Sequence, residues 1–199
     1  MLKSDEAFMK SALRLAKKAQ IQDEVPVGAI IVYNGQIIGR GYNRRQTKQN
    51  AIEHAELMAI AQACRKLGSW RLEDCTLYVT LEPCPMCAGA IIQSRLAHVV
   101  FGAYDAKGGA VAHEPNLLDL PKWNHHPTWQ GGLLEEECSI LLKSFFKEKR
   151  LHKKLQKKAH QLNSDGVAED QKNNNRENQK GEESNGLSSV VSQVSAHQF

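Results

Sequence analysis

The stretch TLYVTLEPCPMCAGAIIQSRLAHVVFGA, residues 76–103, decides the fold that we expect for this chain. Its two ends, Thr76–Leu81 and His98–Ala103, are short apolar runs of the kind that form buried strands. Prolines interrupt the chain between them, and Met86–Arg95 then favours a helix, since proline suits the beginning of a helix. Strand, helix and strand in this order predict parallel pairing, because parallel neighbours need a crossover connection.

The residues before this stretch predict a strand hairpin between two helices. Val25–Tyr33 and Gln36–Gly41 are β-rich runs, and the intervening Asn34-Gly35 is the pair that a two-residue type I′ turn prefers. Apolar residues recur at helical spacing after Ser4, which suits an N-cap. Helical spacing returns from about Glu53 to Lys66, after a polar loop. The first half of the chain therefore supplies two helices and an antiparallel strand pair.

The whole pattern predicts one α/β domain. A chain of 199 residues, 41% apolar and 24% charged, fits a single ordinary core better than two separate cores. Because parallel pairing follows an opening hairpin, we expect a mixed sheet that helices cover on both faces. Residues 107–130 are irregular and rich in Gly, Pro, His and Asn, and a segment of this length is usually functional or mobile.

The C-terminal part divides into a helix and a tail. Leu133–Phe146 resumes helical spacing, and residues 147–158 continue it with seven basic residues against one acid. We therefore place the domain at residues 1–160, with this basic C-terminal helix included. In residues 161–199 only nine of 39 side chains are apolar, so we expect a disordered polar tail.

The basic segment has two interpretations. The formal net charge of the chain is +4, and its positive charge gathers in residues 147–158. Such a segment suits a polyanion such as RNA, and a solvated helix face is the alternative. The candidates for RNA backbone contacts are Lys153, Lys154, Lys157 and Lys158. The adjacent His125 and His126 either touch RNA or are simply solvated.

Composition also limits where the protein works. No run reaches the ~18 to 20 uninterrupted apolar residues of a membrane helix, so we expect no membrane partner. The first twenty residues carry Asp5 and Glu6, which a targeting segment would avoid. Five cysteines are too few for a disulfide scaffold. We therefore expect a soluble protein of the cytoplasm.

Two short motifs carry metal-site chemistry, namely His54-Ala55-Glu56 and Pro83-Cys84-Pro85-Met86-Cys87. Two thiolates and an imidazole are ligands that Zn²⁺ takes, and three protein ligands leave the fourth position to water, as in catalytic sites. A helix that begins near Pro85 presents Cys84 and Cys87 on one side of its first turn, where the positive dipole end favours thiolates. We therefore expect one zinc ion per chain, held by His54, Cys84 and Cys87.

Glu56 is the candidate for proton transfer. It can border the same cleft as His54 only in the first turn of a helix, since the two positions are nearly opposite on a regular helix. A hydroxide on zinc would make the centre anionic, and a nearby carboxylate would then hold a proton more readily. The implied reaction is hydrolytic attack on an electron-poor carbon that carries an amine leaving group, with Glu56 as the proton shuttle.

Other interpretations of these motifs stay open at this point. A thioredoxin-like redox pair would not call for the upstream His-x-Glu motif. A zinc-stabilised RNA-binding module would have no use for Glu56 beside an open metal position. Cytosine, guanine or free-nucleoside deaminases would use the same zinc site, and the basic segment is what favours RNA. We expect Cys64, Cys75 and Cys138 to be buried thiols and not ligands.

The paired motif resembles the signature of zinc-dependent nucleobase deaminases. Further stretches resemble bacterial-type tRNA-specific adenosine deaminases, and they are VPVGA at 25–29, GYNR at 41–44, HAELMA at 54–59, LYVTLEPC at 77–84, CAGA at 87–90 and VVFGA at 99–103, followed by Asp105-Ala106-Lys107. The resemblance covers roughly residues 5 to 160. It departs at residues 108–113, where related bacterial loops often carry Thr or Ser.

The resemblance implies a fold, a reaction and further site residues. The fold is cytidine-deaminase-like, a three-layer α/β/α sandwich with a mixed, mostly parallel sheet of five strands. The reaction is hydrolytic deamination of adenosine to inosine at the wobble position of a tRNA anticodon, by zinc-bound hydroxide with Glu56 as proton shuttle. By the same resemblance, Asn43 meets the flipped nucleoside, Asp105 contacts the neighbouring nucleotide, and the protein is a homodimer that binds the anticodon loop.

Overall fold

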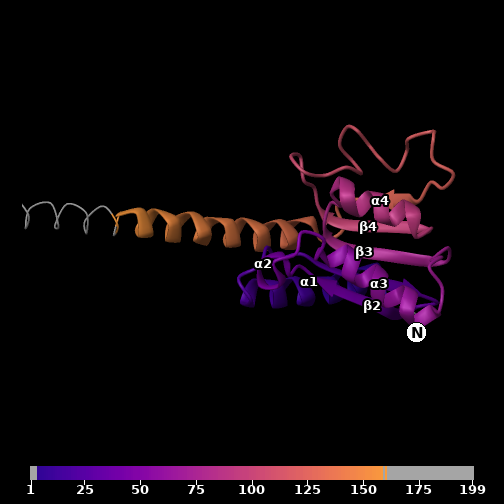
Figure 1. Cartoon of the computed structure of the whole chain (residues 1–199), viewed down its shortest axis with the longest axis horizontal. Helices are drawn as coiled ribbons and strands as arrows, with labels where there is room; N and C mark the ends of the chain where they lie inside the picture. The colour runs from indigo at the N-terminus through magenta and orange to yellow at the C-terminus, as the bar shows by residue number, and fades with distance from the viewer. Residues whose placement is uncertain (1–3, 159, 161–199) are drawn as a thin grey trace, which may run out of the picture. The chain divides into compact units, whose positions relative to one another are not determined.

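The computed structural model describes residues 4–158 and 160 (Figure 1). Its described residues up to Lys147 form one compact unit, and those from Glu148 on belong to a second. The elements are α1 (Asp5–Ile21), β1 (Gly28–Tyr33), β2 (Gln36–Tyr42), α2 (Arg45–Lys48), α3 (Ala55–Leu67), β3 (Cys75–Leu81), α4 (Pro85–Gln93), β4 (His98–Ala103) and β5 (Thr128–Gln130). A further helix, called here the C-terminal helix, runs through residues 135–158.

The sheet confirms the mixed arrangement. Its five strands lie in the order β2-β1-β3-β4-β5. β1 pairs antiparallel with both β2 and β3, whereas β3, β4 and β5 pair in parallel. Four strands therefore run in one direction and β1 runs against them, so the sheet is mostly parallel by strand direction. The antiparallel pairing of β1 with β3 was not expected, because we predicted parallel pairing after the hairpin.

Most element boundaries lie within two or three residues of the predicted ones, and two short elements were missed. The polar loop before α3 contains the one-turn helix α2, and the irregular segment 107–130 ends in β5. β5 pairs with β4, where Thr128 lies opposite His98. Elements of three or four residues have too little length to show a hydrophobic period.

Helices cover both faces of the sheet, as the pattern predicted. One face packs Ile31, Leu77 and Val99 against apolar residues of α3 and α4. The other face packs Ile30, Tyr78 and Val100 against α1 and against the C-terminal helix. Successive strand residues alternate between these two clusters, because side chains of a strand point to opposite faces in turn. The result is the three-layer α/β/α sandwich that the resemblance implied.

Glycines of β2 set the position of α3. A side chain at Gly41 would overlap the carbonyl oxygen of Ala55, and one at Gly39 would overlap that of Ala59. The helix backbone therefore lies directly on the strand, which only residues without a Cβ permit. This close approach fixes the first turn of α3, where His54 and Glu56 lie.

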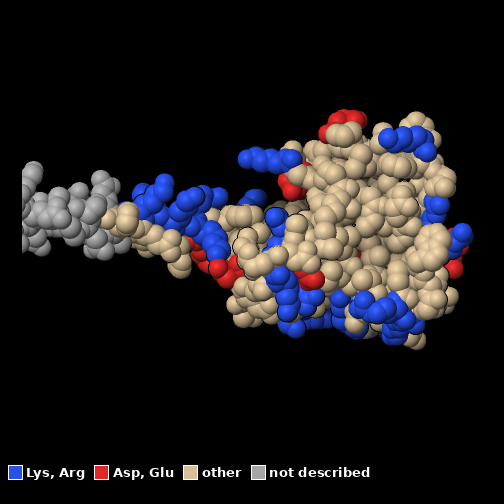
Figure 2. Space-filling view, viewed as in Figure 1, with Lys and Arg blue, Asp and Glu red and all other residues tan. Residues whose placement is uncertain are grey.

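The C-terminal helix extends through the basic segment, as expected. Residues 148–158 are helical, every one of them is exposed, and Lys and Arg are prominent along this segment in Figure 2. Lys153 and Lys157, like Lys154 and Lys158, are four residues apart, so the four lysines share one side of the helix. No helix among the described residues is long and apolar enough to cross a membrane. The predicted tail, 161–199, lies outside the described residues.

Candidate active site

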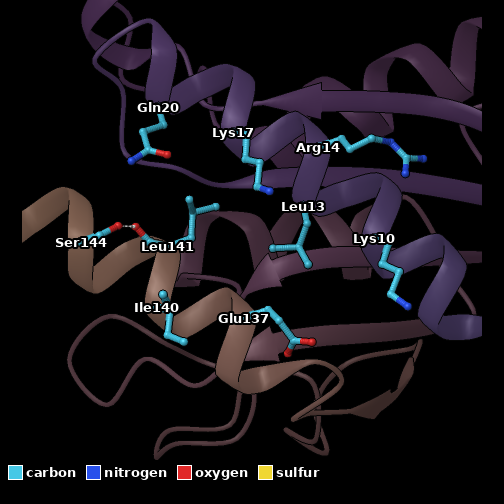
Figure 3. Close-up of a pocket in the computed structure, with 9 residues that line it drawn as sticks. All are labelled: Lys10, Leu13, Arg14, Lys17, Gln20, Glu137, Ile140, Leu141 and Ser144. Atoms are coloured by element: carbon cyan, nitrogen blue, oxygen red, sulfur yellow. Dashed lines mark hydrogen bonds between the residues drawn. The ribbon is translucent and has the colours of Figure 1, made fainter.

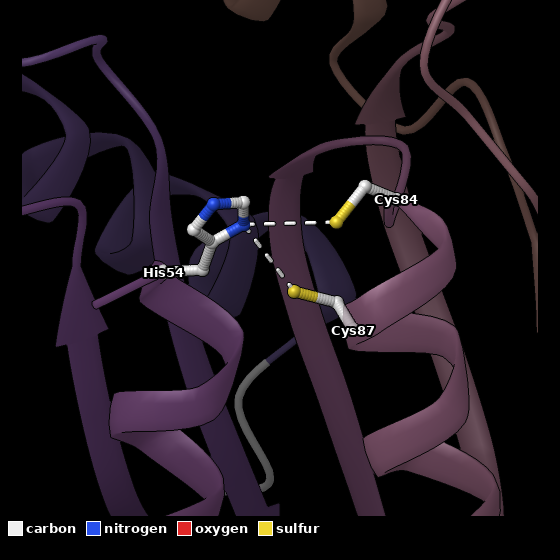
Figure 4. A group of neighbouring side chains, drawn as sticks. All are labelled: His54, Cys84 and Cys87. Carbon is white, nitrogen blue, oxygen red and sulfur yellow. Dashed lines mark hydrogen bonds between the residues drawn. The ribbon is translucent and has the colours of Figure 1, made fainter. Parts of the chain in front are cut away.

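The beginnings of two helices bring the predicted metal ligands together. His54 is the N-cap residue of α3, Cys84 is the N-cap residue of α4, and Cys87 lies in the first turn of α4. Figure 4 shows the imidazole facing both sulfur atoms across the gap between these helices. His54 Nδ1 lies 3.7 Å from Cys84 Sγ and 3.5 Å from Cys87 Sγ. The structure therefore brings the three predicted ligands together at one point.

These distances fit a tetrahedral zinc site. With zinc at its usual distances from nitrogen and sulfur, tetrahedral geometry separates two such ligand atoms by about 3.6 Å. The three ligand atoms lie within 4.8 Å of one another, and among the described residues the group has no fourth member. Three protein ligands and one position for water are the pattern of a catalytic zinc site.

The two thiols differ in their electrostatics. A hydrogen bond from Cys87, together with the contact to His54, lowers the pKa of Cys84 to about 4 although burial opposes this. The same hydrogen bond and burial raise the pKa of Cys87. The site is thus poised to carry negative charge at Cys84, beside two helix N-termini whose dipoles favour it.

Glu56 lies beside the ligands without joining them. It is in the first turn of α3, as predicted, and its residue is only 4% exposed. Burial is the main cause that raises its pKa. A carboxyl group in this position readily holds a proton and can release it, which is the property that general acid–base chemistry needs.

A cavity of about 160 Å³ opens onto the site. Its lining brings Asn43, His54, Glu56, Cys84 and Asp105 together, so the two residues implied by the resemblance share the cavity with two of the three predicted metal ligands. Prediction from the sequence assigned no role to the remaining lining residues, which are Val25, Val27, Arg45, Ala55, Leu81, Glu82 and Gly108. Val25, Val27, Leu81 and Glu82 stand in the motifs VPVGA and LYVTLEPC. The resemblance of these motifs to the family is the signal in the sequence that could have identified them.

Asn43 and Asp105 are each held by backbone groups. Asn43 is buried, and its Nδ2 donates to the carbonyl oxygen of Val25 at 3.4 Å. Asp105 Oδ1 accepts hydrogen bonds from the amides of Lys107 and Gly108, both at 3.1 Å. Asp105 therefore caps the turn that follows β4 and also lines the cavity.

Glu82 is a buried charge for which the sequence suggested no role. Its carboxylate accepts hydrogen bonds from the amides of Asp105, Val111 and Ala112 and from the imidazole of His113. Burial alone would raise its pKa, but the hydrogen bonds from these amides and from His113 outweigh burial and lower it. Glu82 is therefore an ionised group beside the cavity.

Other sequence candidates lie outside this site. His125 Nε2 donates to the carbonyl oxygen of Leu96 at 2.7 Å, and His126 Nδ1 donates to that of Leu118 at 3.2 Å, so both rings have structural partners. Cys75 and Cys138 are buried as expected, whereas Cys64 is half-buried. Burial raises the pKa of Cys75 to about 11 and that of Cys138 to about 12.

A larger hollow of the described surface lies elsewhere. It measures about 550 Å³ and lies between α1 and the C-terminal helix (Figure 3). Its lining combines the cations Lys10, Arg14 and Lys17 with apolar side chains such as Leu13 and Ile140. None of the metal-ligand residues borders it. Size alone therefore does not identify the active site.

The mixed sheet and the His-Cys-Cys group beside a buried glutamate define a deaminase of the cytidine-deaminase-like fold. A family model described as MafB19-like deaminase matches residues 3–150. A tRNA-specific adenosine deaminase of Bacillus subtilis (strain 168) is 53% identical over 154 residues, which make up 77% of this chain and 96% of that protein. The chain belongs to the tRNA-specific adenosine deaminase family.

Solved structures agree with this assignment. A structure from a study of A-to-I editing by tRNA:A34 deaminases has a TM-score of 0.66 and 43% identity, and the match covers 68% of this chain and 99% of that one. The guanine deaminase of Nitrosomonas europaea has a TM-score of 0.64 and 26% identity, with 73% of this chain and 86% of that one covered. The same fold therefore serves enzymes that act on different purines.

Proposed function

We propose that this protein converts adenosine to inosine at the wobble position of a tRNA anticodon, by hydrolysis that requires zinc. The observation that carries the proposal is the placement of Glu56 in one cavity with His54 and Cys84. The identity of 53% with a tRNA-specific adenosine deaminase supports the choice of reaction and substrate.

Zinc is the cofactor that this donor set fits. An imidazole nitrogen and two thiol sulfurs, at tetrahedral separations, match the ligands and geometry that zinc takes. A zinc ion held by His54, Cys84 and Cys87 would supply an activated water molecule for the hydrolysis. The described residues offer no other group of three His, Cys, Asp or Glu side chains that could hold a metal.

Glu56 then moves the protons. It accepts a proton as water attacks C6 of the adenine ring, and it donates that proton to the neighbouring ring nitrogen. A second proton passes to the departing amino group, so that one water molecule is consumed and one ammonia molecule leaves. Its burial and raised pKa suit a group that must hold a proton between these two steps.

Asn43 and Asp105 bind the substrate in this proposal. The amide of Asn43 is anchored to the carbonyl of Val25 and lines the cavity beside the metal ligands, which suits contact with the flipped nucleoside. Asp105 lines the same cavity from the turn after β4, which suits contact with the neighbouring nucleotide. Both assignments follow the family resemblance of the surrounding motifs.

We also propose the bounds of the domain, its contacts with the RNA backbone, its oligomeric state and its location. The deaminase domain comprises residues 1–160, and Lys153, Lys154, Lys157 and Lys158 contact the RNA backbone. The protein acts as a homodimer in the cytoplasm, without a membrane partner, and the tail 161–199 takes no part in chemistry. The exposure of all four lysines on one side of the C-terminal helix supports their role.

A deaminase of a free purine is the second candidate. The likeness to a guanine deaminase favours it, because the zinc ligands and the proton shuttle do not by themselves select the ring. A zinc-stabilised RNA-binding module is the non-enzymatic alternative. The buried position of Glu56 beside an incomplete ligand set argues against that module.

A direct assay separates these candidates. Zinc-loaded protein is incubated with an anticodon stem-loop that carries A or C at the wobble position, and in parallel with free adenosine and free guanine. Inosine only in the stem-loop with A, read as G by sequencing, is the expected result. Uridine from C, or turnover of guanine alone, would assign another substrate, and no turnover by wild-type protein that binds the RNA would favour the binding module. Glu56→Ala is the matched inactive control.

A further inference from the structure

Glu82 is buried more completely than any other charged group beside the active site. It stands two residues before Cys84, directly after β3, and its side chain has no exposed surface. Its own backbone amide donates to the carbonyl oxygen of Ala103 at 2.8 Å, which ties this point to the end of β4. A carboxylate removed from water is costly unless donors compensate its charge.

All four donors to this carboxylate come from one segment, residues 105–113, which we call the wall loop. Oε2 accepts from the amide of Asp105 at 3.0 Å and from His113 Nδ1 at 2.7 Å. Oε1 accepts from the amides of Val111 at 3.1 Å and Ala112 at 2.8 Å. The two ends of the wall loop are thus gathered onto a single side chain.

The middle of the wall loop packs against the carboxylate of Glu82. A Cβ at Gly109 would come within 2.5 Å of the carboxylate atoms of Glu82, so any larger residue here would have to displace that side chain. The next amide, that of Ala110, donates to the carbonyl oxygen of Pro83 at 3.0 Å. The loop is therefore wrapped around the residues that lead into the metal ligand Cys84.

The wall loop also forms one side of the substrate cavity, through Asp105 and Gly108. We infer that Glu82 is a positioning residue, which sets the wall loop and thereby Asp105 at a fixed place relative to the metal ligands. The inference rests on the proposed function, since it concerns how the RNA next to the reacting nucleoside is held.

The carboxylate is chemically specific for this task. Four donors converge on two oxygen atoms that only accept, and an ionised carboxylate has about four acceptor positions. A glutamine of nearly the same shape would turn an NH₂ group toward two of these donors. Glu82→Gln therefore keeps the volume and removes the complementarity, which leaves backbone amides unpaired in the buried interior.

The test is a double-mutant cycle with Asp105. KM and kcat are measured on an anticodon stem-loop for Glu82→Gln, Asp105→Ala and the double variant, all loaded with zinc. We expect Glu82→Gln to raise KM about tenfold with kcat within about threefold, since misplacing a binding group weakens substrate binding. In the Asp105→Ala background the same substitution should change KM less than about twofold, because its effect passes through Asp105.

Glu24→Gln is the matched control. Glu24 is equally buried, and it accepts hydrogen bonds from the amide and the hydroxyl of Thr47, outside the wall loop. Any effect of Glu24→Gln should multiply with that of Asp105→Ala, as for independent sites. If the effects of Glu82→Gln and Asp105→Ala multiply in the same way, or if Glu82→Gln loses zinc, the positioning role is wrong.

Two further measurements keep the inference testable without RNA turnover. Amide hydrogen exchange of zinc-loaded protein should show Val111 and Ala112 exchanging at least about tenfold faster in Glu82→Gln, with α3 unchanged. Unchanged protection in the wall loop contradicts the inference whatever the substrate is. If Glu82→Gln does not fold, Gly109→Ala perturbs the same contact from the loop side, and it should show the same rise in KM and the same coupling to Asp105. Failure of the wild-type protein to turn over RNA would instead refute the proposed function.

Discussion

The predicted metal site and the wall loop both border one cavity, yet they are built in different ways. The predicted metal site uses the beginnings of α3 and α4, so each candidate ligand is placed by a helix that packs on the sheet. The wall loop has no regular structure of its own, and the buried carboxylate of Glu82 joins its two ends. The comparison separates the residues at the beginnings of α3 and α4, which we propose carry out the reaction, from Glu82, which we infer positions the loop that contacts the substrate.

The first prediction removes a ligand and has the largest expected effect. Cys87→Ala should lose zinc and essentially all turnover, because an imidazole and one thiolate do not retain the ion tightly. It should also lower the melting temperature by several degrees, since ~1 kcal/mol corresponds to about 2–4 °C in a domain of this size. Metal analysis and a melting curve measure both. A variant with full zinc content would show that Cys87 is not a ligand.

The second prediction separates metal binding from proton transfer. Glu56→Ala should keep about one zinc per chain and lose turnover by about 10²- to 10⁴-fold, the usual contribution of a positioned acid–base group. Single-turnover kinetics with saturating RNA measure the chemical step, and metal analysis gives the zinc content. Glu56→Gln serves as the isosteric control with the same expected loss. A zinc-free Glu56→Ala protein would mean that Glu56 is itself a ligand.

The grouping of His54, Cys84 and Cys87 could be predicted from the sequence because each of the two motifs is local. Cys84 and Cys87 are three residues apart, the proline between them marks the start of a helix, and His54 and Glu56 stand together in one motif. The three layers were equally predictable, since β1, β3 and β4 are short apolar runs and the helices between them show helical spacing. What joined the two motifs was the preference of zinc for two thiolates and an imidazole, and the structure places these three ligand atoms within 4.8 Å of one another.

The wall loop could not be predicted for the opposite reason. The groups that donate to Glu82 lie 23 to 31 residues from it in the chain. Three of them are backbone amides, and the sequence does not show which backbone amides will donate to a given side chain. The same limit explains β5, whose three residues pair with β4 only because the irregular segment returns to the sheet edge. The antiparallel pairing of β1 with β3 arises because β3 lies beside β1 and not beside β2, and the order of elements in the chain does not reveal this.

The third prediction concerns substrate binding by the wall loop. Asp105→Ala should raise KM for the stem-loop about tenfold, with kcat nearly unchanged, because a binding contact is lost and the metal centre is intact. Asp105→Asn is the control, since its amide oxygen can still accept from the amides of Lys107 and Gly108 and so retain the turn. If Asp105→Asn restores wild-type KM, the carboxylate serves only as a cap. A large loss of kcat would instead place Asp105 in the chemical step.

The fourth prediction has the smallest effect on chemistry and concerns the basic side of the C-terminal helix. Replacing Lys153, Lys154, Lys157 and Lys158 with glutamine should raise KM and leave single-turnover chemistry at saturating RNA unchanged, because phosphate contacts add affinity without reaching the reacting atoms. The slope of log affinity against log salt should fall by up to about three, at roughly 0.7 per phosphate contact on a single strand. Arg65→Gln with Lys66→Gln, in the last turn of α3 and far along that helix from His54, is the control and should leave the slope unchanged. If the fourfold variant kept the wild-type slope, the four lysines would be an ordinary solvated face. Recognition of RNA would then rest on the cavity and its wall loop.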